Sequence, residues 1–539
     1  MSLTTQFLSS IRGFVKKQDG VSLRAWLRVE SDSSPQYFQL AEELRTGFAS
    51  EDAVARLVEK CMPLEDGDGG AGATWPSLVA FLKEYMHYWR EVNFDDIQTL
   101  YPLLSTLLIS CSTAFSHPSG SLLLETCVAF SESLAQLVMV VHHRPDLISH
   151  MRSSAGDDEE RKSPVESTAD IIQKMCTACL SEKSINRFAR PEGRRLGFYR
   201  LVNLVLRLLF AGDKARWASQ TFTNISSMGP PLDFYPAAQR VTYLYYLGRF
   251  YLENNHFSRA TLCLEAAYLQ TPPHCQRHRR LILTYLIPSK LLIGVFPTAS
   301  LLSRPEAVDE LRVVFAPIAT AVKQGNFAAF QATLREHEAW LVRHRLHLTL
   351  SYRLRPLLWR SLARRTFLLT YVPPSNDVVV QQEGGAARGR AAPILDLADL
   401  LTAAVLAQHQ IEGYLVAPRQ RPPHINTLFL KAVENSTDAI STLAAPPGGI
   451  RKLRPSEGLI WGNMAVTMAD VESIVSSLVA QGMMHGFVAH AASKFAVVGA
   501  KAKGSAVLAG WPPVAEVMRE RLLANDIDIT TVPAWVKAP

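Results

Sequence analysis

The sequence predicts a mainly α-helical protein, a helical-repeat solenoid that ends in a winged-helix module with a small β-hairpin. Apolar residues recur at helical spacing through most of residues 75–372, and short breaks rich in glycine, proline or polar residues separate the runs. Near the C-terminus, a helical pattern is followed at once by two short strand patterns. A helix that leads directly into a hairpin is typical of the second half of a winged helix.

The composition is that of a folded protein. Of the 539 residues, 48% are hydrophobic and 19% are charged, which provides enough apolar side chains for a large core. The formal net charge of +7 is small for this length, so any electrostatic partner must be bound by local clusters. Seven cysteines with a single CxxC pair, Cys176 and Cys179, predict buried reduced thiols rather than a disulfide framework or a zinc site.

No segment predicts a membrane or export function. The N-terminal twenty residues lack the apolar core and cleavage site of a secretory signal. The apolar stretch 281–296 contains Pro288 and Lys290 and is too short to span a bilayer comfortably. We therefore expect a soluble intracellular protein with no membrane partner.

The clearest repeat unit runs from Leu244 to Pro272. Its small residues lie where two helices would cross, and its larger apolar residues lie where they would fill the space beside each crossing. The residues assigned to this packing are Leu247, Gly248, Tyr251, Ala260, Leu264 and Ala267. The order resembles a tetratricopeptide repeat (TPR), which implies a right-handed TPR-like solenoid. An ordinary amphipathic helix pair is the alternative.

Further helix pairs are expected on both sides of this unit. One pair covers residues 196–228 and breaks at Gly212-Asp213, and the other begins at Leu311 and turns at Gly325-Asn326. The second pair is expected to return as one helix over residues 327–344. Repeated turns followed by an aromatic residue favour stacked helix pairs.

The winged-helix prediction depends on the last strong element of the chain. Thr467 and Asp470 form a capping pair at the start of a helix, and Gly482 is a natural stop at its end. Residues 486–490 and 494–498 then read as two strands joined by a short loop. The predicted apolar face of the helix carries Ile474, Leu478 and Val479.

The chain is expected to have six parts. They are an N-terminal helical region (1–150), an exposed polar loop (151–168), TPR-like repeats (169–372), a linker (373–392), a winged helix (393–515) with an insertion at about 412–463, and a C-terminal tail (516–539). A helix is expected at about 396–407, and another near 428–433 within the insertion.

Several motifs resemble those of the PCI-domain family. They are Tyr285-Leu286-Ile287-Pro288, Gly325-Asn326-Phe327, Leu478-Val479-Ala480-Gln481-Gly482, Gly486-Phe487-Val488-Ala489-His490 and Trp511-Pro512-Pro513. The resemblance covers about residues 196–372 and 468–515. Within the family, the chain is similar to the PCI subunit of the nuclear transcription-and-mRNA-export complex and to its signalosome-subunit-twelve-like paralogue.

The resemblance implies a non-enzymatic scaffold that couples transcription to mRNA processing and nuclear export. Its implied partners are a larger PCI-domain protein, bound winged helix to winged helix, a small acidic disordered protein shared with the proteasome lid, and RNA or DNA. The implied location is the nucleus, including the nuclear pore, with some protein in the cytoplasm. The alternatives are a signalosome-subunit-twelve-like protein in RNA processing or splicing, and an unrecognised enzyme. The sequence has no phosphate-binding loop, HExxH motif or nucleophile elbow, so we expect no catalytic residues, metal or cofactor.

Basic residues are the candidate binding groups. Residues 343–365 contain seven arginines and no acid, which favours a groove for an acidic peptide. The residues assigned to an acidic partner are Arg277, Arg279, Arg280, Arg353, Arg360 and Arg364. Arg353, Arg360 and Arg364 would share one face if Pro356 only bends a helix. A solvated helix face is the alternative.

A second basic set is expected to contact phosphates. Its members are Arg451, Lys452, Arg454, Lys494, Lys501 and Lys503. Lysines and arginines in a loop or wing neutralise phosphates without reading bases, so the expected binding to nucleic acid is weak, salt-sensitive and sequence-tolerant. Solubilising loop charge is the alternative.

Overall fold

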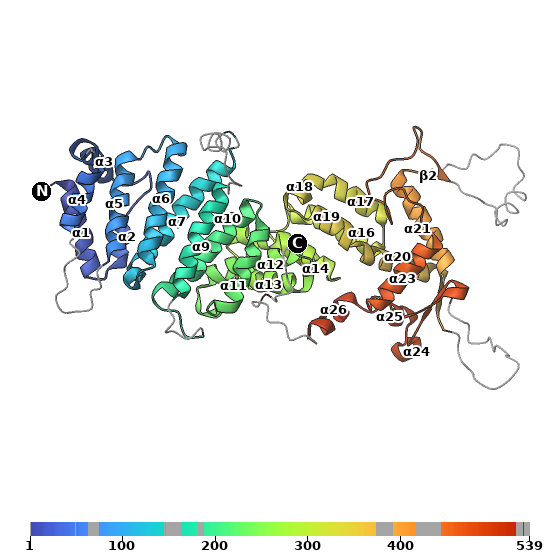
Figure 1. Ribbon diagram of the computed structural model, residues 1–539. Helices are drawn as coiled ribbons and strands as arrows, with labels where there is room; N and C mark the ends of the chain where they lie inside the picture. Colours follow the sequence, from blue (N-terminus) through green and yellow to red (C-terminus); the bar gives the residue numbers. More distant parts are fainter. Residues whose placement is uncertain are drawn as a thin grey trace, which may run out of the picture. The chain divides into compact units, whose positions relative to one another are not determined.

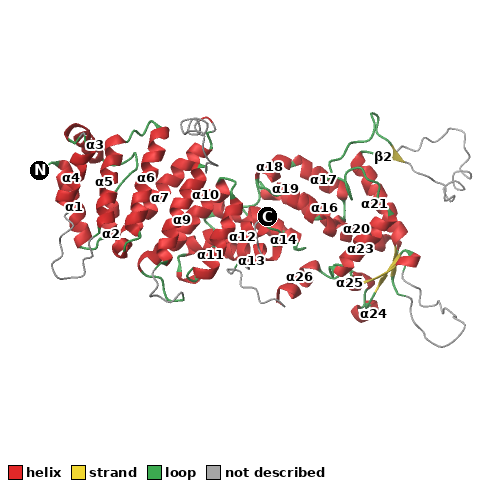
Figure 2. Ribbon diagram, in the orientation of Figure 1, coloured by secondary structure: helices red, strands yellow, loops and turns green. Residues whose placement is uncertain are grey.

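The computed structural model describes residues 2–48, 50–62, 75–144, 146, 163–181, 188–372, 392–416, 443–523 and 532. Regular structure in these ranges is almost entirely helical, with a few short strands (Figure 2), so the mainly α prediction is confirmed. The chain forms two compact units. The first comprises Met1–Asn254, Ala266–Thr271 and Asp528–Pro539, and the second comprises Asn255–Glu265 and Pro272–Ile527.

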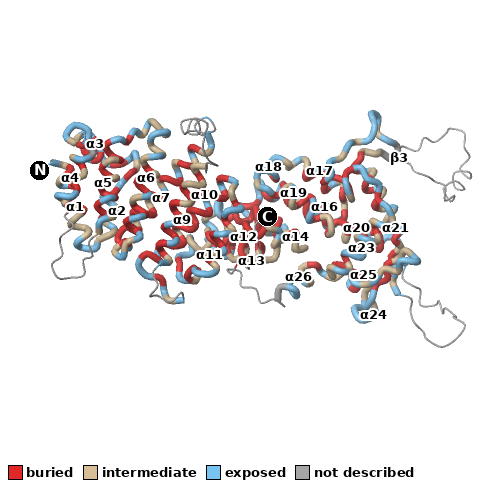
Figure 3. The backbone as a smooth tube through the Cα atoms, in the orientation of Figure 1, coloured by how far each residue is buried: buried red, intermediate tan, exposed pale blue. Residues whose placement is uncertain are grey.

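The first unit is a row of helices in which neighbours in the sequence pack side by side (Figure 1). Its α-helices are α1 (Leu3–Lys16), α2 (Gly20–Trp26), α3 (Pro35–Gly47), α4 (Glu51–Cys61), α5 (Pro76–Glu91), α6 (Ile97–Phe115), α7 (Leu124–His142), α9 (Pro164–Leu180), α10 (Phe198–Ala211), α11 (Ala218–Met228) and α12 (Ala237–Glu253). Short 3₁₀ helices lie at Pro118–Leu123, Gly193–Gly197, Ala215–Trp217 and Leu232–Phe234. Buried residues line the facing sides of the helices (Figure 3) because each one packs against helices on more than one side.

One helical stretch of the described chain, Pro118–His142, is long and apolar enough to cross a bilayer by length and composition, and 56% of its most apolar window is buried. Phe130, Leu134 and Val138 in this stretch are fully buried against neighbouring helices. The core helix of a folded domain has the same composition, and α7 occupies such a position.

The polar loop expected at 151–168 ends earlier than predicted. Ser163 caps α9, with its hydroxyl accepting from the N–H of Glu166 at 3.3 Å, while the Glu166 carboxylate accepts from the N–H of Ser163 at 2.7 Å. Pro164 occupies the first turn, where its missing N–H costs no hydrogen bond. This capping box starts the helix four residues before the predicted loop end, and residues 151–162 lie outside the described residues.

The repeat unit predicted around Gly248 forms the two expected helices, α12 and α13 (Phe257–Gln270). Asn255 makes the turn between them with a left-handed φ of 63°. Part of α13 groups with each of the two compact units. All six residues assigned to repeat packing are buried, namely Leu247, Gly248, Tyr251, Ala260, Leu264 and Ala267.

The second unit continues with shorter helices before the winged helix. They are α14 (Gln276–Leu292), α15 (Ala299–Leu302), α16 (Leu311–Gln324), α17 (Phe327–Glu336), α18 (Glu338–Arg343), α19 (His347–Arg353) and α20 (Arg355–Thr370). The return helix predicted over 327–344 is wrong in its length, because the chain breaks at His337 and continues as α18. The condition under which Arg353, Arg360 and Arg364 would share one face, a helix that Pro356 only bends, is not met. Pro356 lies in the first turn of α20, so Arg353 belongs to a different helix from Arg360 and Arg364.

The winged-helix module is present, and it contains one strand that the sequence did not predict. Its elements are β1 (Ile394–Asp396), α21 (Leu397–Glu412), α23 (Met468–Ala480), β4 (Gly486–Ala489) and β5 (Lys494–Val497), followed by α24 (Ala500–Lys503), α25 (Ala506–Gly510) and α26 (Val514–Leu523). The sheet is antiparallel in the order β1-β5-β4, with Leu395 opposite Phe495 and Phe495 opposite Val488. Thr467 and Asp470 form the predicted capping box, and Gly482 has a φ of +66°.

The buried face of α23 differs from the prediction. Val471, Val475 and Leu478 are buried, whereas Ile474 and Val479 are only partly buried. The sequence pattern identified the helix but placed its inner face about one residue away from the observed one. α21 ends five residues beyond the helix expected at 396–407.

A short two-stranded β-ladder joins two parts of the insertion. Strand β2 (Leu415–Val416) pairs with β3 (Leu443–Ala444) in antiparallel register. The helix expected near 428–433 lies outside the described residues, as do most of the linker and the tail.

Gly325 should be intolerant of any side chain. It has a φ of +65°, and an added Cβ would lie 2.4 Å from the backbone nitrogen of Leu362 in α20. Strain at positive φ and the backbone clash together predict that Gly325→Ala lowers the free energy of unfolding by about 2–4 kcal/mol. Gly13→Ala is the matched control, since a Cβ there meets no atom within 4 Å. Urea unfolding should show Gly13→Ala unchanged within about 1 kcal/mol, and equal effects of the two variants would contradict the prediction.

Candidate functional site

The winged-helix module packs on α20 through a buried tryptophan. Trp511 follows α25 and is 4% exposed. Its ring lies 4.9 Å from the ring of Phe367 in α20 and 6.0 Å from the ring of Phe495 in β5. Trp511 therefore joins the last helix of the repeat region to the sheet of the winged helix.

Arg360 ties the same helix to two loops of the module. Its Nε donates to the carbonyl of Met483 at 2.9 Å, and its Nη2 donates to the carbonyl of Pro512 at 2.7 Å. Burial, followed by the charge of Arg364, lowers the pKa of Arg360 to about 10, so the guanidinium stays charged at neutral pH. Its assignment to an acidic partner needs correction, because two of its three nitrogens already hold the fold together.

The rest of the acidic-partner set is not gathered in one groove. Arg279 is 8% exposed and forms a buried ion pair at 2.8 Å with Glu306, so its predicted partner contact is wrong. Arg280 pairs with Asp309 at 3.4 Å, and the Nε of Arg353 donates to Asn255 at 3.2 Å. Arg277 is exposed on α14, and only Arg360 and Arg364 lie together, one turn apart on α20.

The segment 451–463 is folded against the module rather than loose. The side chain of Gln408 in α21 donates to the Gly462 carbonyl at 3.0 Å and accepts from the N–H of Leu459 at 3.0 Å. Arg355 donates to the Ile460 carbonyl at 2.8 Å. These contacts fix the backbone of the segment on both α21 and α20.

Folding of this segment pairs two of its predicted phosphate-binding residues. Arg451 lies 3.5 Å from the carboxylate of Glu457, and Arg454 lies 2.5 Å from the carboxylate of Glu338. The carboxylate of Glu457 is buried and also accepts from Arg335 at 3.1 Å. Arg451 and Arg454 therefore compensate acids within the protein, which corrects their assignment as free phosphate contacts. Lys452 is exposed and makes no ion pair with another described residue.

The three lysines at the C-terminal end of the winged helix are accessible. Lys494 is half-buried on β5, while Lys501 and Lys503 are exposed on α24. Helix α24 is one turn long and lies between two left-handed glycines, Gly499 and Gly504. The glycines make the sharp bends at the two ends of this turn, and α24 packs beside α25 (Figure 1).

Large apolar side chains accompany these lysines. Phe487 on β4 is 55% exposed, Val498 after β5 is 45% exposed, and Leu508 on α25 is 59% exposed. We name the whole set the wing surface, consisting of Phe487, Lys494, Val498, Lys501, Lys503 and Leu508. The sequence analysis did not identify the apolar members of this surface. A usable signal was Phe487, an aromatic residue in a short predicted strand, which is a candidate for a contact surface when it is exposed.

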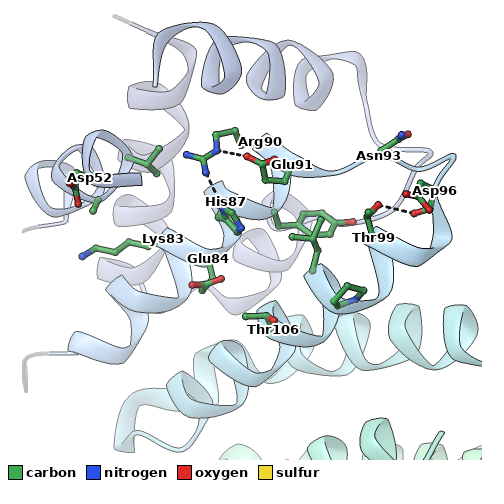
Figure 4. Close-up of a pocket in the computed structure, with 15 residues that line it drawn as sticks. Asp52, Lys83, Glu84, His87, Arg90, Glu91, Asn93, Asp96, Thr99 and Thr106 are labelled. Carbon is green, nitrogen blue, oxygen red and sulfur yellow. Dashed lines mark hydrogen bonds and ion pairs between the residues drawn. The ribbon is translucent and has the colours of Figure 1, made fainter. Parts of the chain in front are cut away.

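A polar cavity in the first unit is the strongest place to look for catalysis. It has a volume of about 1070 Å³ and is lined by residues of α4, α5 and α6, including Lys83, His87 and Arg90 (Figure 4). Arg90 donates to the Glu91 carboxylate at 2.8 Å and contacts Nδ1 of His87 at 3.2 Å. Asp96 caps the start of α6. Arg90, Glu91, His87 and Asp96 thus have structural roles, as pairing or capping groups. No nucleophile–base pair is evident among the residues that line the cavity.

No cluster of metal-ligating side chains occurs among the described residues. Cys176 and Cys179 are both buried in α9, and burial raises the pKa of the Cys176 thiol well above its usual value. A neutral, enclosed thiol is a poor metal ligand.

Comparison with known proteins shows which proteins the chain is similar to. No family model matches the chain. A PCI domain-containing protein of Schizosaccharomyces pombe is 25% identical over 373 residues, which is 69% of this chain and 80% of that protein. PCI domain-containing protein 2 of Danio rerio is 31% identical over 205 residues, 38% of this chain and 49% of the relative. The chain is thus similar to PCI-domain proteins.

The chain is also similar to proteins named CSN12 homolog. A protein CSN12 homolog of Gibberella zeae is 34% identical over 211 residues, 36% of this chain and 43% of that protein. Apart from the Schizosaccharomyces pombe relative described above, the chain spans about half the length of these relatives or less. Together the relatives support a scaffold subunit of a PCI-protein complex.

Arg360 should be needed for the stability of this protein. Arg360→Gln removes two charge-assisted hydrogen bonds to loop carbonyls, which predicts a loss of about 2–4 kcal/mol in the free energy of unfolding. Arg365→Gln is the matched control on the same helix, because Arg365 is exposed and should change stability by less than about 0.5 kcal/mol. Urea unfolding of both variants tests this, and an Arg360→Gln midpoint equal to that of the control would contradict it.

Proposed function

We propose that this protein is a scaffold subunit that couples transcription to mRNA processing and nuclear export, acting in the nucleus and at the nuclear pore. In the proposed assembly, it pairs through its winged helix with a larger PCI-domain protein. It also holds a small acidic disordered protein and contributes to a nucleic-acid surface. The signalosome-subunit-twelve-like role in RNA processing is the second candidate, favoured by the relatives named CSN12 homolog.

The observation that carries the proposal is the wing surface. Exposure of the phenylalanine, valine and leucine side chains to water is unfavourable, and their burial by a partner would favour binding. Lys494 lies on β5, which pairs with the strand of Phe487, and Lys501 and Lys503 follow on α24, so the same module also carries positive charge. Apolar groups suit contact with a protein partner, and basic groups suit contact with the phosphate backbone of a nucleic acid. A surface that combines both can therefore bind the two together.

The acidic partner keeps a smaller set of candidate contacts. Arg277 and Arg364 are exposed, and Arg280 and Arg353 are engaged only in solvent-accessible pairings. An acidic segment can exchange with such weak surface pairings at little cost. We therefore assign this partner to Arg277, Arg280, Arg353 and Arg364, and no longer to Arg279.

Partner identity decides between the two candidate roles. Purification of the full chain from native nuclear extract, followed by mass spectrometry, should recover one large PCI-domain protein in stoichiometric amount. A partner from an mRNA-export complex supports the first role, and one from a splicing or signalosome-like complex supports the second. Recovery of the chain without any PCI-domain protein would refute both.

Phe487→Asp should abolish pairing with the larger PCI-domain protein. A carboxylate at the centre of an apolar contact must be desolvated, which typically weakens such interfaces by 2 kcal/mol or more, or roughly thirtyfold in affinity. Co-purification of the partner should fall to background. Leu348→Asp on α19 makes the same chemical change at a side chain that is 65% exposed, and it should leave the partner bound. Equal recovery with both variants would argue against the wing surface.

Charge reversal of the wing lysines should weaken binding to single-stranded RNA and flatten its salt dependence. Each phosphate contact that is lost reduces the slope of log affinity against log salt by about 0.7. The triple variant Lys494→Glu, Lys501→Glu, Lys503→Glu should therefore lose up to about two units of slope. Fluorescence anisotropy of the assembled complex over a salt series measures this.

A control for net charge changes three exposed cations of the first unit. Lys60→Glu, Lys174→Glu and Arg216→Glu together make the same change in total charge. This variant should keep the wild-type slope within about half a unit. If both triple variants lose the same slope, the effect is one of net charge and the wing surface is not the binding site.

A further inference from the structure

A small cavity in the second unit is lined by three cations, one serine and apolar groups. Its volume is about 420 Å³, and the residues that line it are Gly294, Phe296, Lys323, Leu357, Arg360, Ser361, Arg364, Pro513, Val514 and Ala515. Three of these ten residues are basic and none is acidic. The cavity lies where α16 and α20 meet the start of α26, and we name it the cationic pocket.

The charges in the cationic pocket have no acidic partner among the described residues. Lys323 is exposed, and its Nζ lies over the ring of Phe296, 5.0 Å from the centroid. Arg364 is exposed and no hydrogen bond or ion pair is recorded for it. Arg360 is held by two backbone carbonyls, and no described residue accepts from its Nη1.

The two arginines repel each other. They lie one helical turn apart on α20, and the charge of Arg364 contributes to the lowered pKa of Arg360. Because Arg360 is fixed by its carbonyl contacts, it cannot turn away to relieve this repulsion. An anion between them would compensate both charges and also find the ammonium of Lys323 and the hydroxyl of Ser361.

The backbone around the cationic pocket is arranged for close approach. Gly294 has a φ of +82°, and an added Cβ would lie 2.6 Å from the Cβ of Val514. The absence of a side chain at Gly294 thus lets the start of α26 lie against the turn that follows α14. Val514 and Ala515 are the first residues of a ten-residue helix, whose opening N–H groups have no partner within the helix.

We propose that the cationic pocket binds a phosphate monoester, carried by a phosphorylated serine or threonine of a partner segment. Such a group bears about −1.5 to −2 charges at neutral pH, which the pocket cations match. The apolar wall of Phe296, Leu357 and Pro513 suits the carbon atoms beside the phosphate. A nucleic-acid backbone would need a row of cations along a groove, whereas these cations converge on one small cavity. The inference does not depend on the proposed assembly.

The first test uses inorganic phosphate as the probe on the isolated full chain. Calorimetric titration at constant ionic strength, balanced with sodium chloride, should give saturable binding at one site. The double variant Lys323→Gln, Arg364→Gln should weaken this binding at least about tenfold, since two charge-assisted contacts are lost. Arg360 is left intact because it holds the fold.

The matched control is Arg365→Gln, which removes an exposed arginine next to Arg364 that does not line the cavity. It should change phosphate affinity less than about twofold. Thermal unfolding of each variant verifies that all remain folded. No saturable binding below about 50 mM phosphate, or equal affinity in the wild type and the double variant, would overturn the proposal.

A second titration identifies the source of the phosphate group. The probes are N-acetyl-phosphoserine amide, its unphosphorylated form, and AMP as a free nucleotide. Binding of the phosphoserine probe at least as tight as inorganic phosphate, with none by serine, supports the proposal. Tighter binding of AMP than of phosphoserine, or displacement of phosphate by an RNA oligonucleotide without terminal phosphates, would refute the peptide assignment.

Discussion

The winged-helix module depends on the junction that α20 makes with it. The half-buried guanidinium of Arg360 keeps its charge there because two backbone carbonyls accept hydrogen bonds from it, and Trp511 packs on the same helix through Phe367. The two carbonyls belong to different loops. One loop follows α23 and precedes strand β4, and the other follows α25, after strand β5. One helix of the repeat region thereby fixes both loops and, through them, the presentation of the wing surface.

A second set of contacts extends this arrangement to the insertion. Gln408 satisfies both the N–H of Leu459 and the carbonyl of Gly462, so its buried amide has no uncompensated group. The buried carboxylate of Glu457 is balanced by Arg335 and Arg451. Basic residues that look available in the sequence are therefore part of an internal electrostatic balance. Exposed cations without an acidic partner among the described residues include Lys501 and Lys503 of the wing surface and Lys323 and Arg364 of the cationic pocket.

Local signals were enough to predict the helices and the hairpin. The capping pair of Thr467 and Asp470 and the turn at Gly325 act within a few residues, so the sequence displays them directly. Strand β1 was missed because three residues become a strand only by pairing with β5, about one hundred residues later. Whether Pro356 bends a helix or begins a new one was also not encoded locally, since proline permits both.

Site residues were harder to predict for the same reason. Arg360 and Arg364 look equivalent in the sequence, yet Arg360 finds its acceptors 123 and 152 residues away. Arg279 became a core residue through Glu306, 27 residues downstream. Composition can identify a basic region, but only long-range packing decides which cations remain for ligands.

The ladder of β2 and β3 has a consequence for how this region can change over time. Leu415 pairs with Ala444 and Val416 with Leu443, so the two ends of the chain segment between these strands lie side by side. Doubling the length of such a closed excursion costs only about 0.6 kcal/mol in closure entropy. Sequences of very different length can therefore be inserted between these two paired strands without disturbing the neighbouring helices. Homologues can be expected to diverge at this insertion point, and a fluorescent domain can be grafted there.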